Sequence, residues 1–121
     1  MVIEVLVREQ IEAGRALIVA LERESFPISG ALWHRHEQIG GYWQLLIFSD
    51  LVKQKGPLEA YKELRRIWDK VAPKEISFTD VSVLHPDDPL YAAMRADAVR
   101  RPIPGRRSRD VSFPDAYVYA L

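Results

Sequence analysis

Residues 28–49 read ISGALWHRHEQIGGYWQLLIFS, and the predicted fold is built outward from this stretch. The pattern is typical of two strands joined by a hairpin turn at Gly40 and Gly41. Glycine suits that turn because it adopts the positive φ values that a tight hairpin needs. The sequence therefore predicts one strand over residues 28–36 and a second over residues 42–49.

Side chains alternate between the two faces of a strand, so the position of the turn decides which residues meet. If the pairing centres near residue 39, Trp33 lies opposite Leu45 and His34 lies opposite Gln44. One face then carries Ala31, Trp33, Arg35, Trp43, Leu45 and Ile47. The other face carries Leu32, His34, His36, Tyr42, Gln44, Leu46 and Phe48. Both faces are apolar away from the turn, which predicts a sheet covered on both sides at that end.

Apolar residues recur every three or four positions in three further segments, and this spacing predicts helices. The segments are residues 2–24, residues 57–71, and a stretch that begins at Pro89. Proline is favoured at the first position of a helix, which fits the starts of the second and third segments. Residues 81–85 and 116–121 are short and rich in β-branched or aromatic side chains, so we expect strands there.

The predicted order of elements is α-β-β-α-β-α-β, in one domain that spans residues 1–121. A hairpin followed by strands that alternate with helices indicates the α+β class. We expect a four-stranded, mostly antiparallel or mixed sheet around the hairpin of residues 28–49, packed by three helices. Residues 50–56 are polar and predict a loop, and the arginines and prolines of residues 100–115 predict a longer one.

The composition is that of an ordinary globular protein, with 48% hydrophobic and 28% charged residues. The sequence has no cysteine, which excludes disulfides, thiolate metal ligands and a cysteine nucleophile. The formal net charge is zero, so the chain as a whole has no bulk attraction for nucleic acid or anionic membrane. The longest apolar run, residues 16–21, is far shorter than the roughly 20 residues of a membrane span. We therefore expect a cytoplasmic protein without a cofactor.

Five segments carry a resemblance to known sequences. They are EAGRALIVALE, FPISGALW, YWQLLIFSDLVKQKGPLEAY, FTDVSVLHPDDPL and the terminal DAYVYAL, and together they span most of the chain. They resemble a family of small uncharacterised bacterial proteins with no assigned activity. The resemblance implies one intact domain and no catalytic residues. Members of that family carry apolar or aromatic residues around positions 34 and 36, so it implies no shared role for the histidines found there.

His34 and His36 form an H-x-H motif on one predicted strand. Alternation places both imidazoles on one face, with their Cα atoms about 7 Å apart, which is compatible with a metal site. A third ligand would have to come from His85, Asp87 or Asp88. Such a site would suit a metal-dependent hydrolase. Solvated histidines at a hairpin tip explain the same pattern without a metal.

The stretch HPDDP, residues 85–89, places two carboxylates after a predicted strand, where catalytic groups of α/β folds often lie. Asp88 directly before Pro89 is also the usual arrangement of an N-cap at a helix start. Adjacent aspartates seldom converge on one substrate atom. Capping is the favoured interpretation.

Residues 95–109 carry six arginines and one aspartate, a local charge of +5. Guanidinium groups bind phosphates through two parallel hydrogen bonds, so this loop predicts binding of nucleic acid or a nucleotide phosphate. The residues that would carry it are Arg100, Arg101, Arg106, Arg107 and Arg109. A solvated loop whose arginines pair with acidic groups of the chain or of a second subunit explains the same composition.

The sequence contains no nucleophile elbow, Walker-type loop, dinucleotide fingerprint or zinc-protease helix, and we assign no catalytic residue. We expect a domain that acts by binding, through self-association as a homo-oligomer or by docking a protein partner. The predicted terminal strand of residues 116–121 is the sheet edge that we expect to take part, together with an aromatic surface. A nucleic-acid-associated protein is the alternative, and a metal-dependent hydrolase is a weaker one.

Overall fold

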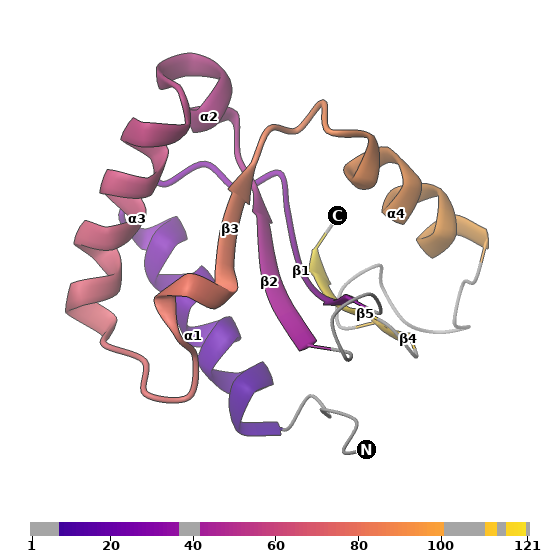
Figure 1. Cartoon of the computed structure of the whole chain (residues 1–121), viewed down its shortest axis with the longest axis horizontal. Helices are drawn as coiled ribbons and strands as arrows, with labels where there is room; N and C mark the ends of the chain where they lie inside the picture. Colours follow the sequence, from indigo (N-terminus) through magenta and orange to yellow (C-terminus); the bar gives the residue numbers. More distant parts are fainter. Residues whose placement is uncertain (1–7, 37–41, 101–110, 114–115, 121) are drawn as a thin grey trace.

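Over the residues that it describes (8–36, 42–100, 111–113 and 116–120), the computed structural model has a mixed sheet of five strands in the order β3-β2-β1-β5-β4 (Figure 1). The strands are β1 (Gly30–His36), β2 (Tyr42–Phe48), β3 (Val81–Leu84), β4 (Val111–Phe113) and β5 (Ala116–Ala120). The helices are α1 (Arg8–Arg23), α2 (Asp50–Lys55), α3 (Pro57–Val71) and α4 (Pro89–Arg100). A 3₁₀ turn, η2 (Phe78–Asp80), precedes β3. The expected α+β class and mixed sheet are confirmed.

The central hairpin forms in the register that its sequence predicts. Trp33 pairs with Leu45 and His34 pairs with Gln44, in an antiparallel ladder that runs the full length of β1 and β2. On the far side of β1, β5 is also antiparallel, whereas β3 lies parallel to β2. The alternation of the hairpin therefore fixes which side chains reach each face of the sheet.

The first face of the sheet is covered by α1 and α3, which lie side by side on it in Figure 1. Its hairpin residues Ala31, Trp33, Trp43, Leu45 and Ile47 are buried, as predicted. They pack with Leu17, Ile18 and Leu21 of α1 and with Ala60, Leu64, Ile67 and Trp68 of α3. This cluster is the main core of the protein.

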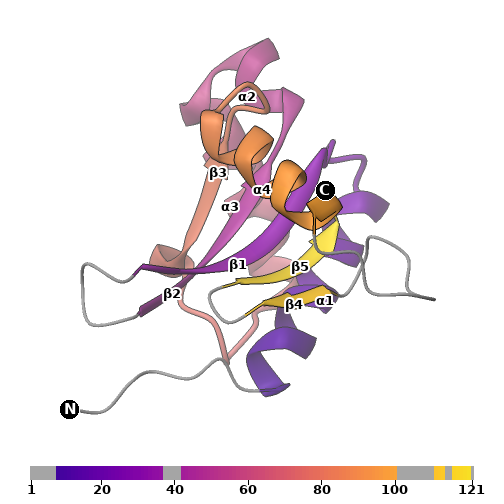
Figure 2. The same ribbon diagram turned by 90° about the vertical axis from the view of Figure 1, so that its right-hand side faces the viewer.

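The second face carries a smaller cluster beneath α4, which Figure 2 shows in front of the sheet. Leu32, Leu46, Phe48 and Val118 are buried there. Leu90, Tyr91 and Met94 of α4 pack on them, which fits the three- and four-residue apolar spacing from which that helix is predicted. The ring centroids of Tyr91 and Phe48 lie 4.8 Å apart. Three layers result, with the sheet between α1 and α3 on one side and α4 on the other.

α1 lies close to the sheet at Gly14, which is buried. The Tyr119 hydroxyl of β5 donates a hydrogen bond to the Ile11 carbonyl (2.6 Å) and accepts one from Trp33 Nε1 (2.8 Å). A β-carbon at Gly14 would overlap that hydroxyl and lie 3.1 Å from Trp33 Nε1. Burial raises the pKa of Tyr119 well above its ordinary value, so the hydroxyl keeps the proton that it donates. Glycine at position 14 is what allows this contact.

The predicted loop over residues 50–56 is wrong, because residues 50–55 form α2. The helix is capped by Ser49, whose hydroxyl accepts a hydrogen bond from the Leu51 N–H (3.1 Å) and donates one to the Pro27 carbonyl (2.5 Å). Leu51 and Val52 pack against the main core. The buried Ser49 cap and the apolar contacts of Leu51 and Val52 therefore stabilise α2, although the polar composition of this segment does not favour a helix.

The strand expected to form an edge, residues 116–121, also differs from the prediction. β5 lies between β1 and β4, so its backbone is paired on both sides. β4 forms the edge instead, and it comes from residues that we predicted as loop. A three-residue strand next to Pro114 has too few positions for an alternating pattern to be visible in the sequence. Residues 116–118 of the terminal strand are therefore paired with neighbouring strands on both sides.

We expect Gly14→Ala to destabilise the fold. Overpacking costs about 1–3 kcal/mol, which should outweigh the gain of about 1 kcal/mol in helix propensity. Urea unfolding measures the net change. In a Tyr119→Phe background the added β-carbon meets no hydroxyl, so the same substitution should cost less. Equal costs in the two backgrounds would show that the Tyr119 hydroxyl is not what constrains position 14.

Ser49→Ala should lower the free energy of unfolding by about 2 kcal/mol, because it removes a helix cap and leaves the partly buried Pro27 carbonyl without its donor. Ser49→Thr keeps the hydroxyl and is the matched control, with a smaller expected loss. Thermal and urea unfolding of the two variants would decide. An alanine variant as stable as the parent protein contradicts the proposed role of this cap.

Candidate binding surface

The two histidines proposed as metal ligands belong to β1, and the structure separates them from the third ligand that we expected. His34 is half-buried and lies opposite Gln44 in the ladder. His85 follows β3, whose last residue Leu84 pairs with Phe48. Phe48 is four residues along β2 from Gln44, so about 13 Å of strand separates the two ends. His85, Asp87 and Asp88 thus lie at the opposite end of the sheet from His34.

Within the part of the chain that the structure describes, no group of three possible ligands among His, Cys, Asp and Glu could hold a metal ion. His36 is the last residue of β1. Metal binding by His34 and His36 stays a prediction, without a third ligand from residues 85–88. A hydrolase that combines the histidines with Asp87 or Asp88 is not supported by this geometry.

The aspartates before α4 have a capping geometry. Asp88 Oδ1 accepts a hydrogen bond from the Leu90 N–H (2.9 Å), and the Asp88 carbonyl accepts one from the Tyr91 N–H (2.9 Å). His85 Nδ1 accepts a hydrogen bond from the Asp87 N–H (3.0 Å). These contacts hold the turn that leads into the helix, and they confirm the capping interpretation of Asp88.

The arginine cluster lies mostly beyond the described part of the chain. Arg100 is the last residue of α4, while Arg101, Arg106, Arg107 and Arg109 are outside the described residues. Nucleic-acid or phosphate binding by this loop therefore stays a prediction.

The three tryptophans and Tyr119 are buried, and the other tyrosines are half-buried. Trp33, Trp43 and Trp68 are all buried in the main core, and Trp68 meets Phe78 edge to face at 5.3 Å between centroids. The Tyr61 hydroxyl accepts a hydrogen bond from the Val83 N–H (3.0 Å), and the Tyr91 hydroxyl donates one to the Ser29 carbonyl (3.1 Å). These five rings therefore serve the packing of the fold, and docking through an aromatic surface stays a prediction.

An open groove lies instead between α1 and α3, on the outer side of the first helical layer. It has a volume of about 420 Å³. Its floor is formed by small and apolar side chains, namely Ala16, Val19, Ala20, Ile67 and Val71. Its rim is charged and carries Glu12, Arg15, Arg23, Glu24 and Lys70. We call these ten residues the α1–α3 surface.

Val19 is the apolar anchor of the α1–α3 surface. Its side chain is 41% exposed, and Leu58, at 67%, is the other large hydrophobic residue exposed in the described part of the chain. Leu58 belongs to α3, whose buried residues are Ala60, Leu64, Ile67 and Trp68. The sequence signal that marks Val19 is an apolar residue on the otherwise charged side of α1, directly opposite the core positions Leu17 and Leu21.

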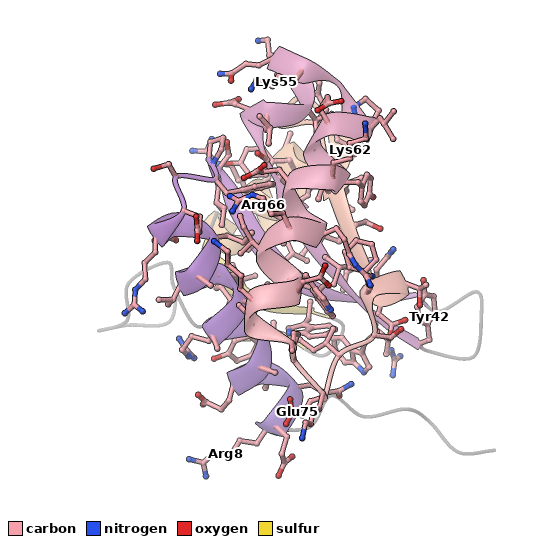
Figure 3. The ribbon with its side chains drawn as sticks, turned by 90° about the vertical axis from the view of Figure 1, so that its left-hand side faces the viewer. Arg8, Tyr42, Lys55, Lys62, Arg66 and Glu75 are labelled. Carbon is pink, nitrogen blue, oxygen red and sulfur yellow. The ribbon has the colours of Figure 1, made fainter. Side chains whose placement is uncertain are left out.

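Ion pairs fix one side of the groove. Glu24, just after α1, accepts hydrogen bonds from Lys70 (2.7 Å) and Arg66 (3.4 Å) of α3, and Arg66 also contacts Glu63. Figure 3 looks onto this helical face, with Arg66 on the side of α3 that faces α1. The hydrogen bond from Lys70 holds the pKa of Glu24 below its ordinary value, and Arg66 does the same for Glu63. The ion pairs of Glu24 with Lys70 and Arg66 thus connect α1 and α3 at the upper end of the groove.

Two further cavities flank the groove and are more polar. One, of about 250 Å³, lies among Glu24, Phe26, Lys55, Glu59 and Glu63. The other, of about 520 Å³, lies among Arg8, Glu9, Glu12, Ala13 and Glu75, near the labelled Arg8 and Glu75 in Figure 3. Both are lined largely by ionised side chains, which favour contact with water over contact with an apolar ligand.

Comparison of the chain with models of known protein families, with curated proteins and with solved structures gave no match. The α1–α3 surface therefore has to be interpreted from its own chemistry.

Among the described residues, no helix has the length and apolar character that crossing a bilayer requires.

We expect Asp88→Ala to lower the free energy of unfolding by about 1 kcal/mol, because the first turn of α4 loses its cap. Asp87→Ala removes a neighbouring carboxylate that does not cap the helix and serves as the control, with little expected change. Thermal unfolding of both variants measures the difference. If the two substitutions cost the same, the role of Asp88 is not capping.

Proposed function

We propose that this chain is a binding domain, not an enzyme, and that it acts by docking an α-helix of a protein partner on the α1–α3 surface. The observation that supports the proposal is an exposed apolar anchor, Val19, at the centre of a groove with a floor of small side chains. Amphipathic helices bind in such grooves through apolar side chains spaced three and four residues apart. We propose that the domain does so in the cytoplasm.

The length of the surface matches a short helix. Its lining runs along α1 from Glu12 to Arg23, which corresponds to about 17 Å of helix. Alanine at positions 16 and 20 allows the backbone of an incoming helix to approach closely. Full burial of a valine side chain is worth roughly 1.5–3 kcal/mol, so Val19 can act as a binding hot spot.

The charges of the rim define the chemistry of the partner. Both signs are present, with Glu12 at one end of the α1 wall and Arg23 at the other. Arg23 is exposed and has no ion pair within the described residues, so its guanidinium is available to a carboxylate of the partner. The fitting helix therefore has a small apolar stripe flanked by an acidic and a basic side chain, not a surface of a single charge.

A peptide titration would test this proposal. The probe is a 16-residue (about 24 Å) helix-stapled peptide with valine or leucine at spacings of three and four, between one acidic and one basic residue. At about 1 mM peptide, which detects even weak affinity, we expect changes in the amide NMR signals of Ala16, Val19 and Val71. A scrambled peptide of the same composition should cause none.

Two variants control the titration. Val19→Glu should abolish the changes, because it places a charge at the centre of the apolar floor. Leu58→Glu makes the same change at the other exposed hydrophobic residue and should leave binding intact. If no stapled peptide shifts these signals, or if the scrambled peptide shifts them equally, the proposed function is wrong.

A further inference from the structure

The order of the side chains on the outer side of α1 is complementary to the same order in the reverse direction. Glu12, Ala16, Val19 and Arg23 are all exposed and are spaced by four, three and four residues, so they form one stripe along the helix. All four line the α1–α3 surface. This is the spacing of the contact positions in a coiled coil, although the stripe is only three turns long.

We propose that the helix docked on the α1–α3 surface is α1 of a second copy of this chain, in an antiparallel pair with two-fold symmetry. This inference rests on the proposed function and names its partner. When the symmetry axis passes between Leu17 and Ile18, Glu12 lies opposite Arg23 of the partner helix, and Ala16 lies opposite its Val19. Each of these contacts occurs twice, as a symmetric interface requires.

The charges select the antiparallel direction. In that arrangement both ends of the stripe carry a Glu12–Arg23 pair of opposite sign. A parallel pair would instead place Glu12 against Glu12 and Arg23 against Arg23, and like charges in an interface disfavour that partner orientation. Within one chain, the described contact of Glu12 is a loose pair with Arg15 at 3.8 Å, and both side chains are largely exposed. Glu12 and Arg23 therefore contact solvent in the single chain. At each end of the stripe, a guanidinium or carboxylate of the partner helix can take the place of that solvent.

The apolar contacts fit the same register. Val19 would pack beside Ala16 of the partner, so a larger side chain meets a small one at both central positions, which allows close packing. Beside Arg23, at the upper end of the groove, α3 contributes Lys70, whose ammonium is already held by Glu24 at 2.7 Å. The second copy therefore meets a neutralised pair there.

The size of the contact sets the expected affinity. A 16-residue helix is about 24 Å long, and one helix pair with few large side chains falls short of the roughly 800 Å² per partner of a standard interface. We therefore expect a weak, concentration-dependent dimer with a dissociation constant on the order of 10–100 μM.

Sedimentation velocity over a range of concentrations tests the dimer and its charge pairs. Glu12→Arg and Arg23→Glu should each weaken dimerisation at least about tenfold, because each places like charges at both ends. The double variant Glu12→Arg with Arg23→Glu restores opposite charges and should return to within about threefold of the parent protein. Val19→Glu should abolish the dimer and Leu58→Glu should not, while circular dichroism verifies that each variant is folded.

Disulfide trapping tests the direction of the helices, since the chain has no cysteine of its own. A mixture of Ala16→Cys and Val19→Cys proteins should give mainly the mixed disulfide, because residue 16 faces residue 19 in the antiparallel register. Homodisulfides in excess would indicate parallel helices and overturn the proposal. A protein that is monomeric at all concentrations, or a dimer unaffected by Val19→Glu, also overturns it. The stapled peptides separate the two proposals. If they still bind to a protein that is always monomeric, or whose dimer is unaffected by Val19→Glu, helix docking remains the proposed function and only the identity of the docked helix is wrong.

Discussion

The contact between Gly14 and the Tyr119 hydroxyl is the constraint on which the arrangement of α1 depends. Tyr119 comes from the last strand, Trp33 from the first strand and Gly14 from the first helix, so one hydroxyl joins elements from both ends of the chain. A buried hydroxyl must find hydrogen-bond partners, and here it has both a donor and an acceptor. The helix can approach the hydroxyl only where it has no β-carbon. This fixes the position of α1 along the sheet as well as its rotation.

The rotation of α1 connects the core to the proposed function. Because Gly14, Leu17, Ile18 and Leu21 face the sheet, the opposite positions of the helix must face outward. Those positions include Ala16 and Val19, and their exposure is therefore a consequence of the Gly14 contact and not an independent property of the surface. A helix that lacked the glycine would stand further from Tyr119 or turn about its axis, and either change would alter the stripe.

The sequence predicted the parts of the fold that depend on alternation and on helix starts. The hairpin register follows from two glycines and a period of two, and the start of α3 follows from Pro57. The elements that the sequence did not predict, α2 and β4, depend on tertiary contacts. α2 is short and polar, and it exists because the buried Ser49 caps it and because Leu51 and Val52 reach the core. The β4 edge could not be found because three residues are too few to show a period, and its presence moved β5 into the interior of the sheet.

The candidate surface was harder to predict from the sequence than the fold, for a related physical reason. Aromatic side chains are the usual mark of a binding surface, but here Trp33, Trp43 and Trp68 are needed to fill the main core of a small domain. The exposed stripe of α1 holds only alanine, valine and two charged residues, a composition that looks like that of an ordinary solvated helix. Such a surface has little apolar area, so its specificity must come from the order of its charges along the helix. In that situation a self-complementary order, acidic at one end and basic at the other, favours a second copy of the same helix over an unrelated one.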